Sequence, residues 1–473
     1  MDPEQTRNYY QQSRAARWTA LATISVCYIL SAMTLSSTHV AIPAIGEDLH
    51  ASALLLSWIP TAYLLTNVVL LLPFGRLADT YGRRRVFLLG VVLLTLGTLL
   101  AGLAPAIGWL LAARVVQGIG GAMLFACGMA IVLSTFPVHF RGTAIGIISG
   151  SAYLGLTGGP LVGGFLTEFA GWRSVFLVQV PLGLAVTVLI VAKLKGEWRS
   201  TVVQPFDWRG SAALAVWALS LSIGFSLVPG LPGLSLVVLG VLVLAYFIRH
   251  LARAPHPLVD VRAVRANRDF FRAITNAALM YASAYPLVFL LSLYLQYILG
   301  KSPAQAGSIM FVQAMVMAFM SPISGRLADR HNPQSIAAAG SFCVACGFAV
   351  LAAAGFNTPA LHILAGLLLI GVGMGLFSTP NNSAGLSAVS ANRLGESSAL
   401  INLSRNFGNI WSTVLVLLFI SLFLGGEKIQ PAQYGTLLWV TRLLFGLSCL
   451  YALFACWLNI GSRRSVSSPA GAE

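Results

Sequence analysis

The sequence predicts an all-α membrane protein with fourteen transmembrane helices, arranged as two parallel six-helix bundles plus two inserted helices. Of its 473 residues, 57% are apolar and only 9% are charged, which is too little polar surface to cover a water-soluble protein. Apolar runs of roughly 20 residues, the helix length that crosses a bilayer, recur along the chain. The stretch from Gly75 to Arg85 returns in a weaker form from Gly325, which indicates an internal repeat.

Breaks at glycines, prolines and charge clusters divide the chain into the predicted spans. These are residues 18–42, 54–74, 86–104, 108–134, 143–168, 174–193, 209–228, 233–251, 270–299, 304–325, 335–355, 359–388, 397–424 and 437–460. The first run is too long for the apolar core of a signal peptide and leads directly into further spans, so we interpret it as a transmembrane helix.

Glycines repeat between the two ends of the chain, since Gly120 and Gly155 recur at equal spacing as Gly373 and Gly408. Spans 1–6 therefore match spans 9–14, and the even number of spans between the copies gives both the same orientation. The expected parts are an N-terminal tail at 1–17, a first bundle at 18–193, a linker with two extra helices at 194–269, a second bundle at 270–460 and a C-terminal tail at 461–473.

Positive charge is distributed unevenly between the two sides of the predicted helices. Of the 29 Lys and Arg residues, 23 lie in the two tails, in alternate loops or at the helix ends beside them, and only Arg173, Lys301 and Lys428 lie opposite. This bias places both termini in the cytoplasm. It also explains the net charge of +15 better than a nucleic-acid partner does, so we expect none.

Other function classes lack the residues that they require. A phosphate-binding loop ending at Gly300 would need a glycine where Leu295 stands, which argues against ATP-driven chemistry. Cys343 and Cys346 have the spacing of a metal-binding pair, but further ligands are not apparent, so we expect no metal and no cofactor. A membrane sensor or an intramembrane enzyme is disfavoured, because no soluble output domain and no nucleophile with its base stand out.

The stretch that repeats carries the first specific motif: Gly75, Asp79, Gly82, Arg83 and Arg84 follow the second span. This pattern resembles the signature between helices 2 and 3 of the major facilitator superfamily, and the fourteen spans resemble its fourteen-helix drug:proton antiporter family. The resemblance implies the major facilitator fold. The glycines permit tight turning, the arginines favour the anionic inner leaflet, and Asp79 paired in only one state would form a conformational latch. The alternative is a solvated loop charge.

The fourth span contains Arg114 and Gln117, which resemble the second signature of the family. An arginine within the membrane costs roughly 2.5–3.5 kcal/mol, so it faces a cavity or a partner unless its side chain reaches the surface. The resemblance implies a role near the proton path. His39 and Glu168 are the other candidates for proton coupling, although a lone histidine is more often a structural hydrogen-bonding group.

The fifth span contains Gly155, Gly159, Pro160, Gly163 and Gly164, which resemble the antiporter signature of the superfamily. Small residues four positions apart allow two helix backbones to approach closely, and an internal proline removes one hydrogen bond. We call these five residues the antiporter seam. Thr413 stands where Pro160 would repeat, so the second half lacks an equivalent.

Thr34 stands in the first span where many members of the family carry aspartate, and the sequence places no acidic residue at the middle of a span. The charges within the spans are Arg114, Arg405 and Arg442, so we expect neutral or anionic amphiphilic substrates rather than strongly cationic ones. The sequence around Pro380 predicts a helix break that lines water. Candidate substrate contacts are Thr34, Gln117, Tyr285, Gln313, Asn381 and Asn382.

These features together predict a multi-pass transporter of the bacterial inner membrane that exports small molecules by alternating access in exchange for protons. The alternatives are an exporter or importer of one metabolite with different coupling or none. The expected partners are the substrate, protons and the lipid bilayer, and the protein acts either with a periplasmic adaptor or as a monomer.

Overall fold

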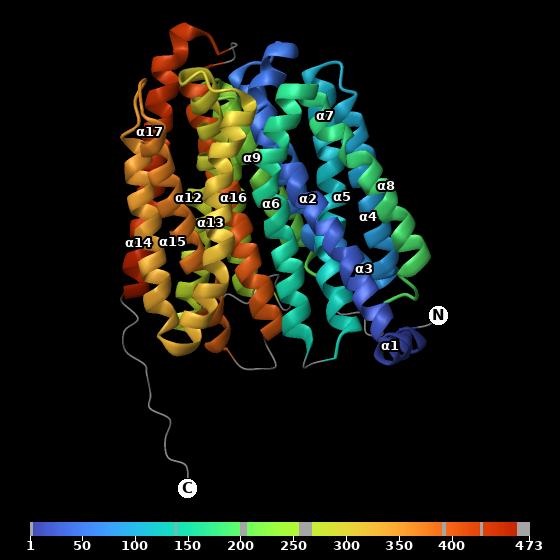
Figure 1. Cartoon of the computed structure of the whole chain (residues 1–473). Helices are drawn as coiled ribbons and strands as arrows, with labels where there is room; N and C mark the ends of the chain where they lie inside the picture. Colours follow the sequence, from blue (N-terminus) through green and yellow to red (C-terminus); the bar gives the residue numbers. More distant parts are fainter. Residues whose placement is uncertain are drawn as a thin grey trace. The chain divides into compact units, whose positions relative to one another are not determined.

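A computed structural model describes residues 3–137, 140–198, 206–254, 267–389, 394–425 and 429–460. In these ranges the chain is helical and contains no strand (Figure 1). The helices are α1 (Pro3–Gln12), α2 (Arg14–Asp48), α3 (Ala53–Tyr81), α4 (Arg83–Gly102), α5 (Ile107–Thr135), α6 (Arg141–Ala170), α7 (Trp172–Leu177), α8 (Gln179–Lys193), α9 (Trp208–Ser226), α10 (Leu231–Arg253), α12 (Arg268–Leu293), η2 (Tyr294–Ile298), α13 (Pro303–Arg330), α14 (Pro333–Ala352), α15 (Ala360–Ser387), α16 (Leu394–Phe423), η4 (Pro431–Gln433) and α17 (Tyr434–Ile460).

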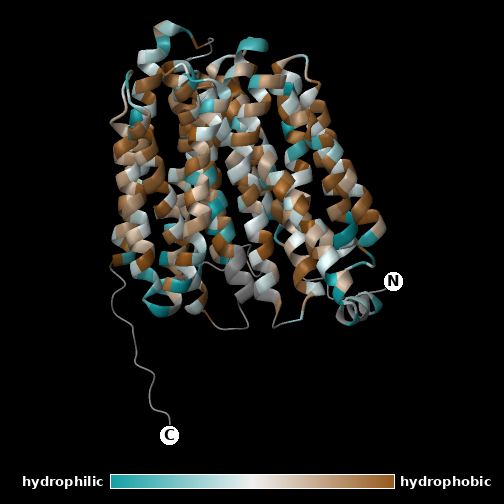
Figure 2. Ribbon diagram, in the orientation of Figure 1, coloured by the Kyte–Doolittle hydropathy of each residue, from teal (hydrophilic) through white to brown (hydrophobic). Residues whose placement is uncertain are grey.

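Each of the fourteen predicted spans coincides with one helix or with two consecutive helices, which are α7 and α8 for the sixth span and α12 and η2 for the ninth. Within the described residues, twelve of these segments are long and apolar enough to cross a membrane, and the two outside that set are α6 and α9. Apolar residues dominate the middle of the helices, whereas polar residues gather toward their ends (Figure 2). The expected all-α membrane fold is therefore confirmed.

The chain divides into two compact units. Unit 1 comprises Met1–Asp260, Val288–Ala314 and Thr413–Val440, and unit 2 comprises Val261–Leu287, Met315–Ser412 and Thr441–Glu473. Four helices, α12, α13, α16 and α17, thus contribute one portion to each unit. The inserted helices α9 and α10 pack against each other in unit 1, where α9 also contacts α3. The predicted boundaries of the tails, bundles and linker stay predictions.

The internal repeat is visible in the helix contacts of each unit. In unit 1, α4 packs on α5 where Gly90 and Gly120 face each other, and in unit 2, α14 packs on α15 through Gly340 and Gly373. A Cβ on Gly340 would lie only 2.7 Å from the carbonyl oxygen of Gly373. Because the same close approach recurs at corresponding positions, the glycine repeat reflects one packing arrangement used twice.

One local expectation about the second half is wrong. The predicted helix break around Pro380 is absent, because α15 continues as one helix from Ala360 to Ser387. Asn381 is buried and its side-chain amide donates to the carbonyl oxygen of Ala273 on α12, at 3.0 Å. The polar group that seemed to require a water-lined break is therefore satisfied by a neighbouring helix.

Candidate functional site

The stretch from Gly75 to Tyr81 is the last part of helix α3 rather than a loop. Only Gly82 separates α3 from α4, and its φ of 113° lies in the region that favours glycine. Asp79 accepts a hydrogen bond of 2.9 Å from Nε of Arg83, four residues later, and Nη2 of Arg83 lies 2.8 Å from the same carboxylate oxygen. Nη1 of Arg83 also donates to Oγ of Ser134 on α5, at 3.4 Å. The Asp79 carboxylate is thus held beside α5 by one arginine.

Glu197 organises the start of α4, although no sequence motif singled it out. Glu197 follows α8, and its Oε1 accepts from the backbone nitrogen of Arg84 at 2.7 Å and from that of Trp198 at 3.1 Å. Its Oε2 lies 3.7 Å from Nε of Arg85. A negative charge at a helix N-terminus is favourable, because the first backbone N–H groups of a helix have no partner within it. The only signal in the sequence was a lone acid after a predicted span.

Helix α1 docks on the same segment after α8. The hydroxyl of Tyr10 donates to the carbonyl oxygen of Lys195 at 3.1 Å and accepts from the backbone nitrogen of Lys195 at 3.0 Å. Tyr10 is fully buried, and this burial raises the pKa of Tyr10 to about 12. The N-terminal helix and the turn between α3 and α4 therefore share one anchoring segment, residues 194–198.

Arg114 lies fully buried in α5 at the centre of a polar network in unit 1. Its Nε donates to the carbonyl oxygen of Ile59 on α3 at 3.0 Å, and its Nη1 donates to Oε1 of Gln117 at 2.8 Å. Nη1 also lies 3.4 Å from the carbonyl oxygen of Thr34 on α2, and the guanidinium lies 4.9 Å from the ring centroid of Tyr63. Arg114 thus ties α2, α3 and α5 together rather than extending to the surface.

Thr34 and Gln117 extend this network to two further helices. The Thr34 hydroxyl donates to Oε1 of Gln179 on α8 at 2.6 Å. Nε2 of Gln117 donates to the hydroxyl of Thr98 on α4 at 2.8 Å. The structure therefore places Thr34, Arg114 and Gln117 in one hydrogen-bonded network, which the sequence did not predict, and adds Gln179, which nothing in its own sequence surroundings had singled out.

The other two candidates for proton coupling lie in different environments. The His39 side chain is buried in α2, and the carbonyl oxygen of His39 accepts from Oγ of Ser292 on α12 at 2.7 Å. Glu168 is exposed near the end of α6, and its Oε2 accepts from the backbone nitrogen of Ala304 at 3.0 Å. Because α13 begins at Pro303, Glu168 caps the N-terminus of that helix.

The antiporter seam lies where α6 packs on α2 and α13 within unit 1. Helices α2 and α6 run side by side (Figure 1). A Cβ on Gly155 would overlap the carbonyl oxygen of Ile29, and one on Gly163 would lie 2.6 Å from that of Ser37. The remaining close approaches join Gly159 to Ser36, Gly164 to Pro303, and Pro160 to Gly307 of α13. The helix continues through Pro160, and backbones at these positions meet where no larger side chain fits.

In unit 2, Asn382 belongs to a second polar cluster. Its Oδ1 accepts from Nη2 of Arg405 on α16 at 2.6 Å, and the Arg405 guanidinium lies 5.1 Å from the ring centroid of Tyr281 on α12. Gln313 lies half-buried on α13 in unit 1. Tyr285 falls on α12, and its side chain is outside the part of the chain that the structure describes.

The sequence profile of the Major Facilitator Superfamily matches residues 24–413. The chain belongs to the Major Facilitator Superfamily. Two curated members are similar over most of their length. The riboflavin transporter RibZ of Clostridioides difficile is 28% identical over 82% of this chain and 85% of its own, and a multidrug resistance protein B homolog of Mycobacterium tuberculosis is 30% identical over 84% and 75%.

A solved structure gives the same fold for this superfamily member. A bacterial homologue of the human lysosomal transporter Spinster superposes with a TM-score of 0.69 over 94% of this chain and 97% of the other, at 18% identity. At that identity the likeness shows the fold alone. The chain is therefore a multi-pass membrane transporter of the major facilitator fold, a family whose members are generally not enzymes.

Proposed function

We propose that this transporter exports amphiphilic small molecules in exchange for protons, by alternating access across the bacterial inner membrane. The observation that carries the proposal is the antiporter seam, because its glycines meet the backbones of α2 and α13 at positions where no side chain fits. The names of curated relatives, which include multidrug resistance proteins and a tetracenomycin C resistance and export protein, support export.

Proton coupling is assigned to the first half of the chain. In this proposal Arg114, whose guanidinium donates to Gln117 and to the carbonyl oxygen of Thr34, forms the buried part of the coupling site, and His39 lies five residues beyond Thr34 on α2. Glu168 contributes at the outer end, where its carboxylate caps α13. Protonation of that carboxylate removes the negative charge that favours the cap, which would loosen the contact between α6 and α13.

The proposed substrate contacts are the polar and aromatic candidates that the sequence predicts, and each unit is considered by itself. In unit 1 these candidates are Thr34, Gln117 and Gln313, and in unit 2 they are Tyr285, Asn381 and Asn382. We expect neutral or anionic amphiphiles as substrates because of Arg405. Its guanidinium lies on the apolar helix α16, where it donates to Asn382 of α15, and its positive charge would repel a cation.

A second function rests on Thr34. Because a hydroxyl stands where many members of the family carry a carboxylate, the transporter would export one metabolite without proton coupling. A relative named as a riboflavin transporter supports this alternative of a single metabolite.

Flux in proteoliposomes with an imposed pH gradient separates the two proposals. Purified protein is reconstituted, a neutral, an anionic and a cationic fluorescent amphiphile are supplied in turn, and a pH dye reports counter-transport of protons. Antiport predicts substrate movement that accelerates with the gradient and stops with a protonophore. A substrate flux that does not change with the pH gradient would favour the second function. Transport of the cationic dye alone would overturn the proposed substrate class.

A further inference from the structure

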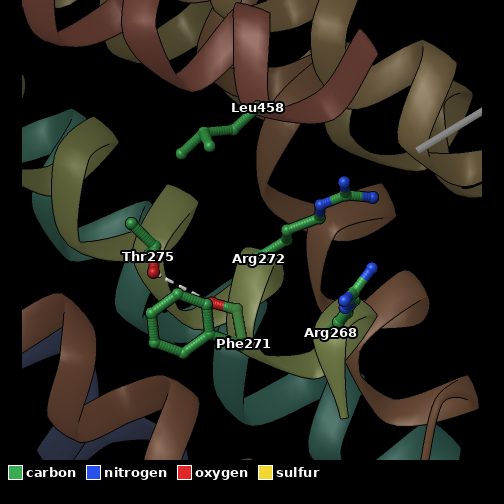
Figure 3. A pocket seen from close by; sticks show the side chains of 5 residues that line it. All are labelled: Arg268, Phe271, Arg272, Thr275 and Leu458. Atoms are coloured by element: carbon green, nitrogen blue, oxygen red, sulfur yellow. Dashed lines mark hydrogen bonds between the residues drawn. The ribbon is translucent and has the colours of Figure 1, made fainter. Parts of the chain in front are cut away.

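A pocket of about 460 Å³ lies in unit 2, at the beginning of α12. Arg268, Phe271, Arg272 and Thr275 of α12 line it, together with Leu458 near the end of α17. Figure 3 shows these side chains around the opening, with both guanidinium groups extending to the same side. The charge bias of the loops assigns this end of α12 to the cytoplasmic face.

The lining combines two cations with an apolar wall. Arg268 and Arg272 are four residues apart, so they project from one face of α12. Phe271 is 47% exposed and lies with Leu458 on the apolar side of the pocket. The Thr275 hydroxyl already donates to the carbonyl oxygen of Phe271 at 2.9 Å, as the dashed line in Figure 3 marks. The hydrogen-bond donors that face a ligand are therefore the two guanidinium groups.

The positive charge of this pocket is only partly balanced by the protein. Nη1 of Arg272 lies 3.7 Å from Oδ1 of Asp269, and both side chains are about one-third exposed, so this is a weak surface pair. Arg268 has no ion pair among the described residues. Among the residues that the structure describes, two arginines lie beside one aspartate, which leaves an excess of positive charge next to an apolar surface.

We propose that this pocket binds the phosphate of an anionic phospholipid from the inner leaflet. The planar guanidinium groups match the geometry of phosphate oxygens, and the inner leaflet is the surface that carries anionic headgroups. The glycerol and the first part of the acyl chains lie against Phe271 and Leu458. The bound lipid joins the beginning of α12 to the end of α17. The proposal is independent of which substrate is transported.

The test compares lipid retention by the full-length protein in detergent micelles. Native mass spectrometry and thermal unfolding are recorded during titration with phosphatidylglycerol and with phosphatidylcholine of the same acyl chains. The double variant Arg268→Gln/Arg272→Gln should bind phosphatidylglycerol at least ~10-fold more weakly than the unmodified protein. The matched control is Arg249→Gln/Arg253→Gln at the end of α10, two exposed arginines with the same spacing that do not line the pocket.

The control should retain the affinity of the unmodified protein, since it loses the same charge from another helix end. Leu458→Trp narrows the apolar side of the pocket without changing the charge and should also weaken retention of the lipid. An equal loss of affinity for phosphatidylglycerol in both double variants would show that the lipid is attracted by positive charge in general, and would overturn the proposal. Competition by inorganic phosphate at millimolar concentration would assign the site to a free anion instead of a lipid, and would overturn it as well.

Discussion

Replacing Gly155 with alanine tests whether α2 and α6 must approach closely. The added Cβ would overlap the carbonyl oxygen of Ile29, a backbone atom that can move only with its helix. Overpacking of this kind costs about 1–3 kcal/mol, whereas Gly→Ala within a helix returns about 1 kcal/mol of propensity. We therefore expect Gly155→Ala to leave the free energy of unfolding unchanged or to lower it by up to about 2 kcal/mol.

A neighbouring glycine on the same helix isolates the packing contribution. Gly158 has no atom within 4 Å of the position that its Cβ would occupy. Gly158→Ala gains the same helix propensity without overlap, so it should stabilise the protein by about 1 kcal/mol. Because the propensity contributions cancel, the two variants should differ by about 1–3 kcal/mol.

The assay is denaturant unfolding in detergent micelles, followed by tryptophan fluorescence, with transport rates measured on the same preparations. Gly155→Ala should also transport more slowly than Gly158→Ala, because the overlap lies in the seam assigned to antiport. Equal free energies of unfolding for the two variants would refute the close approach of α2 and α6 at this position. Equal transport rates would show that the close approach at Gly155 is not needed for transport.

Three further predictions concern helix α1 and the turn between α3 and α4 in unit 1. Asp79→Asn should lower the free energy of unfolding by less than about 1 kcal/mol, because the pair with Arg83 is partly exposed, yet slow transport strongly; unchanged flux in proteoliposomes would rule out the latch. Glu197→Gln should destabilise the protein by about 0.5–2 kcal/mol in the same unfolding assay through the lost charge at the start of α4, and an unaltered stability would contradict its capping role. Since the pKa of Tyr10 is raised to about 12, its contribution to stability is complete below the unfolded value of about 10 and is lost as the pH rises through about 12. Tyr10→Phe should remove this alkaline dependence of thermal unfolding, and its persistence in the variant would assign it to another group.

The helices and the repeat could be predicted because both depend on local patterns. Apolar length determines a span, and glycine at a repeated position marks a close helix contact, as Gly340 with Gly373 illustrates. Helix ends were less predictable near charged residues. Asp79 and Arg83 looked like loop residues, but their pairing at four-residue spacing occurs across the end of α3.

The partners of the candidate site residues could not be predicted from the sequence. Gln179 meets Thr34 across two helices that are far apart in the chain, and a glutamine in an apolar run does not indicate which neighbour it will face. For Asn381 the sequence predicted a feature that is absent, because a polar residue beside Pro380 suggested a helix break and α15 is continuous. Its actual partner is a backbone carbonyl on α12, which sequence patterns do not reveal.

The hydrogen bond from the backbone nitrogen of Arg84 to Glu197 has a consequence for α9 and α10, the two helices between the repeats. The segment after α8 is attached through Glu197 to the turn between α3 and α4. Helix α9 then packs on α3 within unit 1. Helices α9 and α10 therefore belong to unit 1, which they contact both through the segment after α8 and through α9 itself. The connection between the two copies of the repeat can therefore contain two additional helices while α9 stays packed on α3.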